Sequence, residues 1–213
     1  MTQSMTPKKH LIFDFGAVVF RWQPVELLRQ VMPEHAHDDE VARRLVDRIF
    51  KGYTGPWGRF DLGTITVPEL IEALAVQTGL PASAMQRLVD AVPHALAPLP
   101  ETVGWLERLR EAGHRLFFLS NMPAEVADHL EASHAFLSHF EAGVFSSRVQ
   151  LSKPDAAIFQ LALERFGIAA QDTIFLDDLP ANVEAARALG LHAVQFEHAA
   201  QAADALAALG VPA

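Results

Sequence analysis

Apolar and polar positions follow two different rhythms along this chain. Near the start, residues 11–13 form a short apolar run that predicts a buried strand, and Asp14 stands where that run ends, with Gly16 close behind. Beyond residue 100, apolar runs of strand length alternate with segments in which apolar residues recur at helical spacing. Between these two regions only the helical spacing is convincing. The pattern therefore predicts a first strand, then a helical stretch, and then alternating helices and strands.

The alternating region predicts a parallel sheet covered by helices. Its expected strands are 115–119, 142–146, 173–176 and 192–196, and its expected helices are 101–112, 124–130, 155–166, 181–189 and 200–209. Strands joined by helices favour right-handed crossovers, which connect parallel strands. We therefore expect an α/β fold with a doubly wound, three-layer parallel sheet, to which the first strand also belongs.

The middle region predicts a small helical bundle. Start signals precede each of its four expected helices: Pro24 suits a first helical turn, Asp38 and Asp39 can begin the second helix, and two capping boxes, Thr66 with Glu69 and Ser83 with Gln86, open the third and fourth. Residues 53–63, between the second and third helices, are rich in glycine and predict a loop.

These patterns divide the chain into two domains. We expect residues 8–20 and 97–213 to form the α/β core domain, and residues 21–96 to form a helical cap domain inserted after the first strand. On pattern alone, such an insert fits a lid over a site as well as a bundle that only stabilises the fold. In the loop at 53–63, Trp57, Arg59 and Asp61 are candidates to face a substrate.

Composition narrows the possible partners. The chain has 213 residues with 17 Lys and Arg against 26 Asp and Glu, and its net charge of −9 argues against nucleic-acid binding. It contains no cysteine, which excludes disulfides, thiolate nucleophiles and Cys-bound metals. We see no signal peptide and no apolar run of membrane-spanning length, so we expect a cytoplasmic protein that makes no membrane contact. An anionic substrate must then be bound by local groups.

Polar residues follow four of the expected strands. They are Asp14, Ser120 with Asn121, Lys153 in the loop after 142–146, and the adjacent pair Asp177 and Asp178. Each has an ordinary structural explanation on its own, as a turn residue, a helix cap or a surface lysine. Together they would meet at the carboxyl edge of the sheet, where ligands bind in open α/β folds. Adjacent carboxylates repel each other, and a hard cation such as Mg²⁺ would relieve that repulsion.

These residues, in this order, resemble the haloacid dehalogenase superfamily of aspartate-nucleophile hydrolases, and the resemblance covers nearly the whole chain. It implies a Rossmann-like core with a C1-type helical cap, and a phosphatase with Asp14 as the nucleophile. It also implies that Ser120, Asn121 and Lys153 bind the phosphoryl group. Mg²⁺ would be held by the groups that the superfamily uses: the Asp14 carboxylate, the Gly16 backbone carbonyl, and the pair Asp177 and Asp178, of which Asp178 acts most directly.

One position departs from the superfamily's pattern. Most of its phosphatases carry a second Asp, the general acid/base, two residues after the nucleophile, and this chain has Gly16 there. The stretch 13–18 is instead similar to a subgroup that includes α-D-glucose-1-phosphate phosphatase, which implies a sugar phosphate as substrate. Without that acid we expect a preference for activated leaving groups, unless the cap or the substrate supplies the missing acid.

Two other functions stay open at this point. A 2-haloacid dehalogenase would use the same Asp14 nucleophile without Mg²⁺, although the paired acids Asp177 and Asp178 argue against it. A catalytically weak binding or regulatory protein is the second alternative, and intact Asp14, Lys153 and Asp178 argue against that. The leading hypothesis is therefore a Mg²⁺-dependent phosphatase that acts on a small phosphorylated metabolite through an aspartyl-phosphate, with Trp57 and Arg59 in its substrate site.

Overall fold

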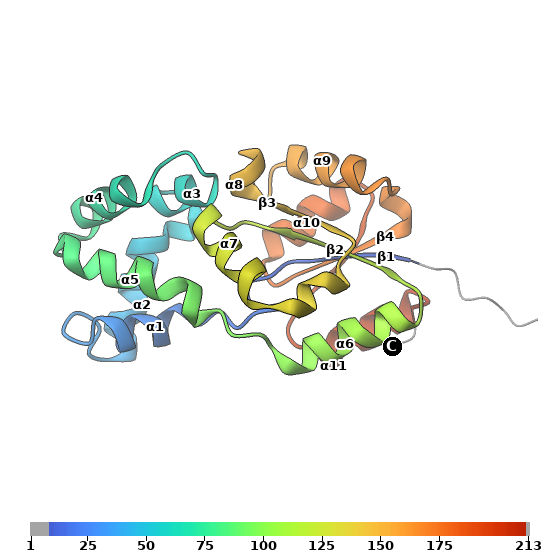
Figure 1. Cartoon of the computed structure of the whole chain (residues 1–213), viewed down its shortest axis with the longest axis horizontal. Helices are drawn as coiled ribbons and strands as arrows, with labels where there is room; N and C mark the ends of the chain where they lie inside the picture. Colours follow the sequence, from blue (N-terminus) through green and yellow to red (C-terminus); the bar gives the residue numbers. More distant parts are fainter. Residues whose placement is uncertain (1–8, 212–213) are drawn as a thin grey trace, which may run out of the picture.

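The structure is a computed structural model that describes residues 9–211. Its centre is a five-stranded sheet with the order β3-β2-β1-β4-β5, in which every neighbouring pair is parallel (Figure 1). The strands are β1 (His10–Phe13), β2 (Arg115–Ser120), β3 (Ala142–Phe145), β4 (Thr173–Asp177) and β5 (His192–Gln195). The predicted α/β class and the parallel sheet are confirmed.

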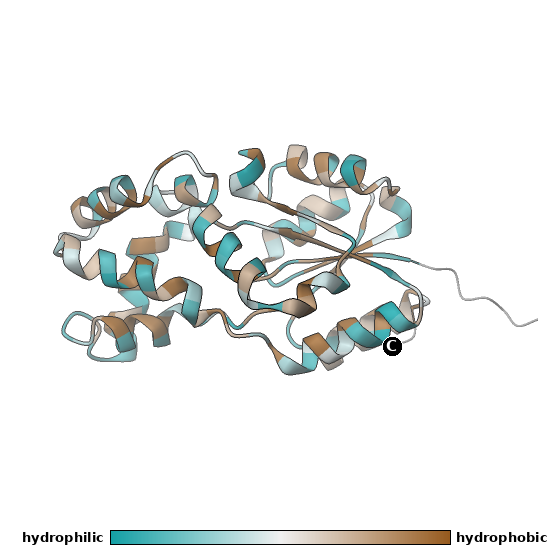
Figure 2. Ribbon diagram, viewed as in Figure 1, coloured by the Kyte–Doolittle hydropathy of each residue, from teal (hydrophilic) through white to brown (hydrophobic). Residues whose placement is uncertain are grey.

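Helices cover both faces of this sheet. In β1, Leu11 and Phe13 belong to one buried apolar cluster, while Ile12 belongs to another. The first cluster includes side chains of α6 (Pro100–Glu111), α7 (Ala124–Ser133) and α11 (Ala199–Ala208); the second includes side chains of α9 (Ala156–Phe166) and α10 (Pro180–Ala188). Figure 2 shows the strands as mostly hydrophobic, whereas the helices carry both hydrophobic and hydrophilic residues. The apolar runs of the sequence are continuous because each strand is buried on both faces.

The helical insert lies between β1 and α6. It consists of α1 (Pro24–Val31), α2 (Asp39–Phe50), a 3₁₀ turn at Lys51–Tyr53, α3 (Pro56–Asp61), α4 (Val67–Thr78) and α5 (Ala82–Ala95). Its apolar residues, such as Leu28, Leu74 and Leu88, belong to the same buried cluster as one face of the sheet. The insert therefore packs on the core domain through shared apolar contacts.

Two predictions in the insert are wrong. Residues 53–63 are not a loop throughout, because α3 occupies Pro56–Asp61, with Pro56 in its first turn. The capping box at Thr66 and Glu69 is confirmed, but the one at Ser83 is not, because α5 begins at Ala82 after Pro81. The extended backbone of Pro81 takes the capping position, which places Ser83 inside the first turn.

Smaller differences concern element ends. Ser146 does not end β3, as predicted, but begins a short helix, α8 (Ser146–Val149). Two 3₁₀ turns, at Ala135–His139 and Ala170–Asp172, were also not predicted. Within residues 9–211, no helix combines the length and the apolar character needed to cross a membrane.

The strand register explains why polar strand ends meet. Phe13, the last residue of β1, pairs with Phe118 of β2 and with Leu176 of β4. The Asp14 amide then donates to the Leu176 carbonyl at 2.9 Å, which continues the pairing one step beyond the strand. Asp14 and Asp177 therefore stand level on adjacent strands, at the place where the strand order of the sheet reverses direction.

Candidate active site

A lysine joins two carboxylates at this edge of the sheet. The Lys153 ammonium nitrogen lies 2.9 Å from Asp14 Oδ1 and 2.6 Å from Asp177 Oδ2. The side chain of Lys153 is 1% exposed, that of Asp177 is 0% exposed and that of Asp14 is 10% exposed. Asp14, the predicted nucleophile, is therefore the most exposed member of the trio, and it lines the pocket together with Lys153.

Asp177 is held by several donors at once. Besides Lys153, its oxygens accept hydrogen bonds from the Leu179 backbone amide at 2.9 Å and from the Asn182 amide nitrogen at 3.0 Å. Such a fully bonded carboxylate serves to orient Lys153. The sequence did not single out Asn182, although an amide in the first turns of α10 beside two acids was the available signal.

Asn121 fixes the backbone of Lys153. Its side-chain amide donates to the Lys153 carbonyl and accepts from the Lys153 amide, both at 2.9 Å. The sequence predicted Asn121 as a ligand for phosphoryl oxygen. The structure commits both ends of this amide to positioning Lys153, although Asn121 also lines the pocket next to it.

The protonation states follow from burial and charge. Burial raises the pKa of Asp14 to about 7, with Lys153 opposing the rise and Asp177 adding to it. Burial and the neighbouring Asp177 raise the pKa of Asp178 to about 6. Burial alone would lower the pKa of Lys153, but Asp14 and Asp177 more than offset that effect, and the pKa lies above its ordinary value. Lys153 is therefore a permanent cation in the site.

The same edge of the sheet fits a divalent cation. Carboxylate oxygens of Asp14, Asp177 and Asp178 lie within 4.8 Å of one another, and Asp14, Gly16 and Asp178 all line one pocket. Oxygen donors of this kind suit Mg²⁺. Burial, with Asp177 adding to it, raises the pKa values of Asp14 and Asp178 despite the nearby Lys153, so a further positive charge would stabilise both carboxylates. Since Asp177 is already bonded to Lys153 and Asn182, Asp14 and Asp178 are the better-placed ligands.

Ser120 has a buried hydroxyl without a partner. The residue ends β2 and is 1% exposed, and its Oγ makes no hydrogen bond among the described residues. Ser120 is not among the residues that line the pocket. Buried hydroxyls are normally satisfied, so the unpaired one at this strand end is free to bind a ligand oxygen. This observation fits the predicted contact between Ser120 and a phosphoryl oxygen.

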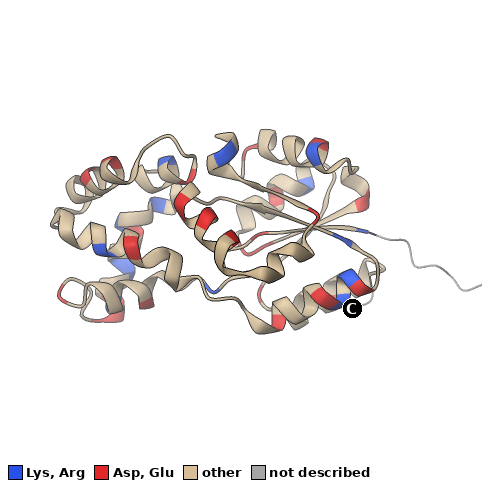
Figure 3. Cartoon of the chain, viewed as in Figure 1, with Lys and Arg blue, Asp and Glu red and all other residues tan. Residues whose placement is uncertain are grey.

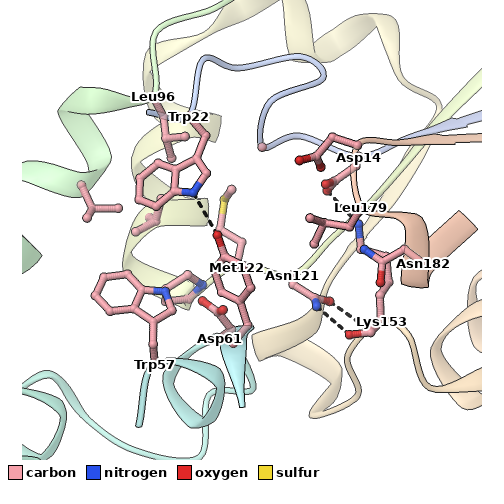
Figure 4. A pocket seen from close by; sticks show the side chains of 16 residues that line it. Asp14, Trp22, Trp57, Asp61, Leu96, Asn121, Met122, Lys153, Leu179 and Asn182 are labelled. Carbon is pink, nitrogen blue, oxygen red and sulfur yellow. Dashed lines mark hydrogen bonds and ion pairs between the residues drawn. The ribbon is translucent and has the colours of Figure 1, made fainter. Parts of the chain in front are cut away.

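The pocket lies between the core and the helical insert (Figure 4). Its floor carries the charged residues described above, and its walls are mainly apolar and aromatic. The wall residues from the insert and its flanks are Trp22, Tyr53, Trp57, Asp61, Val92 and Leu96, and those from the core are Met122, Pro123, Val126 and Leu179. A hydrogen bond of 3.0 Å from the Trp22 indole to the Tyr53 hydroxyl stiffens this wall.

Of the three candidates in the stretch 53–63, Trp57 and Asp61 line the pocket and Arg59 does not. Trp57 is 3% exposed and lines it. Arg59 is exposed and does not line it, because successive residues of α3 point to different sides of the helix. A contact between Arg59 and the substrate therefore stays a prediction from the sequence. Trp22 and Tyr53 were missed, since neither stands at a recognisable motif.

Charged residues elsewhere are mixed. In the part of the chain that the structure describes, Lys and Arg are scattered among Asp and Glu over both halves of the molecule (Figure 3). Many exposed arginines pair with acids, for example Arg148 with Asp128 at 2.7 Å and with Glu131 at 2.6 Å.

The chain is similar to several known proteins. The family described as haloacid dehalogenase-like hydrolase matches residues 11–190. Sesquiterpene phosphatase astK of Aspergillus oryzae is 29% identical over 87% of the chain and 88% of its own length. Phosphorylated carbohydrates phosphatase of Thermotoga maritima is 24% identical over 86% of the chain and 82% of its own length.

Two further comparisons concern a longer protein and a solved structure. Acyl-CoA dehydrogenase family member 10 of Mus musculus is 27% identical over 93% of the chain, which spans 19% of that protein. The crystal structure of a HAD family enzyme of Bacteroides thetaiotaomicron, in complex with magnesium and inorganic phosphate, superposes with a TM-score of 0.65 at 22% identity, over 90% of the chain and 95% of its own. At this identity, the likeness supports the shared fold.

Proposed function

The chain belongs to the family of haloacid dehalogenase-like hydrolases, and we propose that it is a Mg²⁺-dependent phosphatase that acts on a small phosphorylated molecule through an aspartyl-phosphate on Asp14. The observation that carries the proposal is the contact between the accessible Asp14 and the buried Lys153, with Asp178 beside them. A carboxylate nucleophile and a fixed cation are what in-line attack on phosphorus requires.

In this proposal, Asp14 attacks the phosphorus atom through its carboxylate oxygen, and the bond to the leaving oxygen breaks. The Lys153 ammonium and the unpaired Ser120 hydroxyl receive the phosphoryl oxygens, over which negative charge spreads in the transition state. Bound Mg²⁺ would neutralise charge between the phosphoryl group and the carboxylates of Asp14 and Asp178. Water then attacks the phosphorus, phosphate leaves, and the Asp14 carboxylate is regenerated.

Residues 21–96 act as the cap in this proposal. Trp57 and Asp61 reach the pocket from the insert, while Asp14 and Lys153 reach it from the strand ends. A substrate held between the two parts is shielded from water, which strengthens each of its electrostatic contacts. The cap residues would also select the alcohol part of the ester.

The identity of the alcohol part of the ester is a separate question, and two arguments give different answers. The subgroup resemblance predicts a sugar phosphate, and the similarity to the Thermotoga maritima enzyme supports this. The pocket walls favour another choice, because Val92, Leu96 and Val126 offer no partners for sugar hydroxyls. We propose the monophosphate of an apolar alcohol as the preferred substrate, which the similarity to the sesquiterpene phosphatase also supports.

One assay tests both parts of the proposal. Phosphate release is measured with Mg²⁺ and with excess chelator, on p-nitrophenyl phosphate, glucose 1-phosphate, glucose 6-phosphate and farnesyl monophosphate. We expect Mg²⁺-dependent release, with the highest kcat/KM for the apolar ester. A higher kcat/KM for either sugar phosphate would reverse the choice of substrate. Halide release from 2-haloacids without Mg²⁺, with no phosphate release from any ester, would replace the phosphatase by the dehalogenase alternative.

A further inference from the structure

Asp61 is a buried acid that the mechanism above does not use. It is the last residue of α3 in the cap, it is 4% exposed, and it lines the same pocket as Asp14. Figure 4 shows Asp61 on the cap side of the pocket beside Trp57, with Asp14 on the side of the strand ends. A carboxyl group on this side faces the part of the pocket where the alcohol of the substrate would lie.

The site needs such a group because Gly16 supplies none. Gly16 has no side chain that could protonate a leaving oxygen, and a Cβ built there meets no atom within 4 Å. The titratable side chains that line the pocket are Asp14, Tyr53, Asp61, Lys153 and Asp178. The nucleophile, the cation and the proposed metal ligand account for three of them. Tyr53 and Asp61 remain.

Tyr53 is the poorer proton donor of the two. Burial raises the pKa of Tyr53 to about 12, and its hydroxyl accepts the Trp22 indole hydrogen. An efficient general acid has a pKa close to the working pH, from which a tyrosine of this kind is far removed. Asp61 is therefore the remaining candidate for the proton donor.

The protein core fixes the position of Asp61. The Ser146 hydroxyl donates to the Asp61 backbone carbonyl at 2.5 Å and accepts from the Met122 amide at 2.8 Å, and Ser146 is fully buried. Two residues after Asp61, Gly63 has φ +66°, and a Cβ there would lie 2.7 Å from the Ser147 carbonyl oxygen. The end of α3 is thus anchored directly on the start of α8, so the cap presents Asp61 to the pocket in a defined place.

The surroundings of Asp61 keep its proton available. Burial raises the pKa of Asp61 well above its ordinary value; a hydrogen bond from the Trp57 side chain opposes this effect, and the Asp14 charge adds to it. The Trp57 indole can only donate, so it occupies a carboxyl oxygen without taking the acidic hydrogen. A protonated Asp61 can therefore donate to a substrate oxygen in the pocket.

We propose that Asp61 is the general acid, and then the general base, of the phosphatase reaction. The inference rests on the function proposed above. In the first step a bond forms between Asp14 Oδ and phosphorus, the bond from phosphorus to the alcohol oxygen breaks, and the Asp61 proton moves to that oxygen. In the second step the Asp61 carboxylate takes a proton from the attacking water, the bond between Asp14 and phosphorus breaks, and phosphate is released. Asp61 ends the cycle protonated.

The test compares leaving groups in wild type and Asp61→Asn, which preserves size and the acceptor for Trp57. Alkyl phosphates need a proton on the leaving oxygen, whereas p-nitrophenolate leaves without one. We expect kcat/KM for an alkyl phosphate to fall by about 100-fold or more, and for p-nitrophenyl phosphate to fall by less than about 10-fold. Equal falls for both esters would show a structural role and overturn the proposal.

A burst measurement and a control variant complete the test. With p-nitrophenyl phosphate, Asp61→Asn should release a burst of about one nitrophenolate per enzyme, because the loss of the base slows hydrolysis of the intermediate more than its formation. A wild-type burst profile in the variant would contradict the base role. The matched control is Asp47→Asn, an exposed change in α2 of the same cap, which should leave both esters unaffected.

Failure of the inference and failure of the function are distinguishable. If wild type releases no phosphate from p-nitrophenyl phosphate with Mg²⁺, the proposed function is wrong. If wild type is active and Asp61→Asn keeps the alkyl-to-aryl ratio, only the role of Asp61 is wrong. Should Asp61→Asn lose its thermal transition, Asp61→Glu serves instead: a longer acid should retain part of the alkyl activity, and unchanged kcat/KM for both esters would overturn the proposal.

Discussion

Lys153 and Asp14 form an ion pair of 2.9 Å in which the cation is almost fully buried and the carboxylate faces the pocket. The pair connects two distant parts of the chain, the end of the first strand and the loop that precedes α9. Since Asp177 holds Lys153 from the other side at 2.6 Å, the cation cannot follow Asp14 into solvent. The nucleophile is thereby kept beside a positive charge that substrate oxygens can share.

The first prediction is Lys153→Met, which keeps the length of the side chain and removes its charge. Asp14 and Asp177 then lose their cation in a buried site, which typically costs about 3–5 kcal/mol of unfolding free energy. We expect a lower midpoint of thermal unfolding together with a loss of turnover of at least about 100-fold. Calorimetry and a p-nitrophenyl phosphate assay measure the two effects. A variant of wild-type activity would remove Lys153 from the site.

The second prediction is Asp14→Asn. The change keeps the shape of the side chain but removes the nucleophile, so turnover should fall below about one hundredth of wild type. Mass spectrometry after rapid acid quenching should find a phosphorylated peptide containing residue 14 in wild type and none in the variant. Residual turnover above that level, or phosphate on another peptide, would contradict a covalent mechanism at Asp14.

Much of this site was predictable, because parallel strands bring their carboxyl ends to one edge. That rule alone groups Asp14, Ser120 and the pair Asp177 and Asp178 from the sequence. The separate tasks of the pair were not predictable. Asp177 is enclosed by Lys153 and Asn182, whereas Asp178 faces the pocket, and this distinction depends on side-chain contacts between separate elements.

The cap was harder to predict for a different reason. Helical periodicity identified α1, α2 and α4, but it says nothing about which face lies over a distant site. Asp61 lies in a glycine-rich stretch for which the sequence predicts a loop, and its link to Ser146 arises only when the helical insert packs against the sheet and its helices. Arg59 shows the same limitation: the sequence predicted that it faces a substrate, and its place on α3 turns it to the exposed side.

The third prediction concerns metal and pH together. The pKa values of Asp14 and Asp178 are raised in the folded protein, to about 7 and about 6 from an ordinary 3.8. Without metal, protonation of these two carboxyl groups stabilises the folded protein. This contribution to the free energy of unfolding is complete below about pH 4 and is lost as the pH rises through 6 and 7. Mg²⁺ binds the deprotonated forms, so its stabilising effect should increase over the same range.

Thermal unfolding with and without Mg²⁺ checks this prediction. The increase in Tm caused by Mg²⁺ should be larger at pH 8 than at pH 5, and Asp178→Asn should reduce it at pH 8. The same variant should need more Mg²⁺ for half-maximal activity. An equal Tm increase at both pH values, or an unchanged Mg²⁺ requirement in Asp178→Asn, would exclude Asp178 as a ligand.

The fourth prediction concerns the apolar wall. Val92 on α5 is 4% exposed and lines the pocket. In the sequence it is far from the charged residues that line the same pocket. Val92→Asn places an amide where we expect the apolar part of the alcohol, and an unpaired amide costs about 1–3 kcal/mol of binding. The kcat/KM for farnesyl monophosphate should therefore fall by about 10-fold or more, with that for p-nitrophenyl phosphate nearly unchanged. Equal effects on both esters would argue against an apolar binding wall.

The last prediction uses Gly16 to test whether the site has room for a second acid. Gly16 does not adopt a positive φ, and a Cβ there would enter open space, so Gly16→Asp should fold without backbone strain. In wild type, where Asp61 already supplies the proton, the change should have little effect on alkyl phosphates. In the Asp61→Asn background, Gly16→Asp should raise kcat/KM for an alkyl phosphate by at least about 10-fold and leave kcat/KM for p-nitrophenyl phosphate almost unchanged.

This double-variant comparison separates an acid from a structural residue. If Asp61 only holds the cap in place, a carboxyl group at residue 16 cannot replace it, and the double variant will be as slow as Asp61→Asn alone. If Asp61 donates the proton, an acid at either residue 16 or residue 61 can do so. The effects of the two substitutions on kcat/KM for the alkyl phosphate are then strongly non-additive. A large acceleration of alkyl phosphates by Gly16→Asp in wild type would instead show that the native site has no working acid.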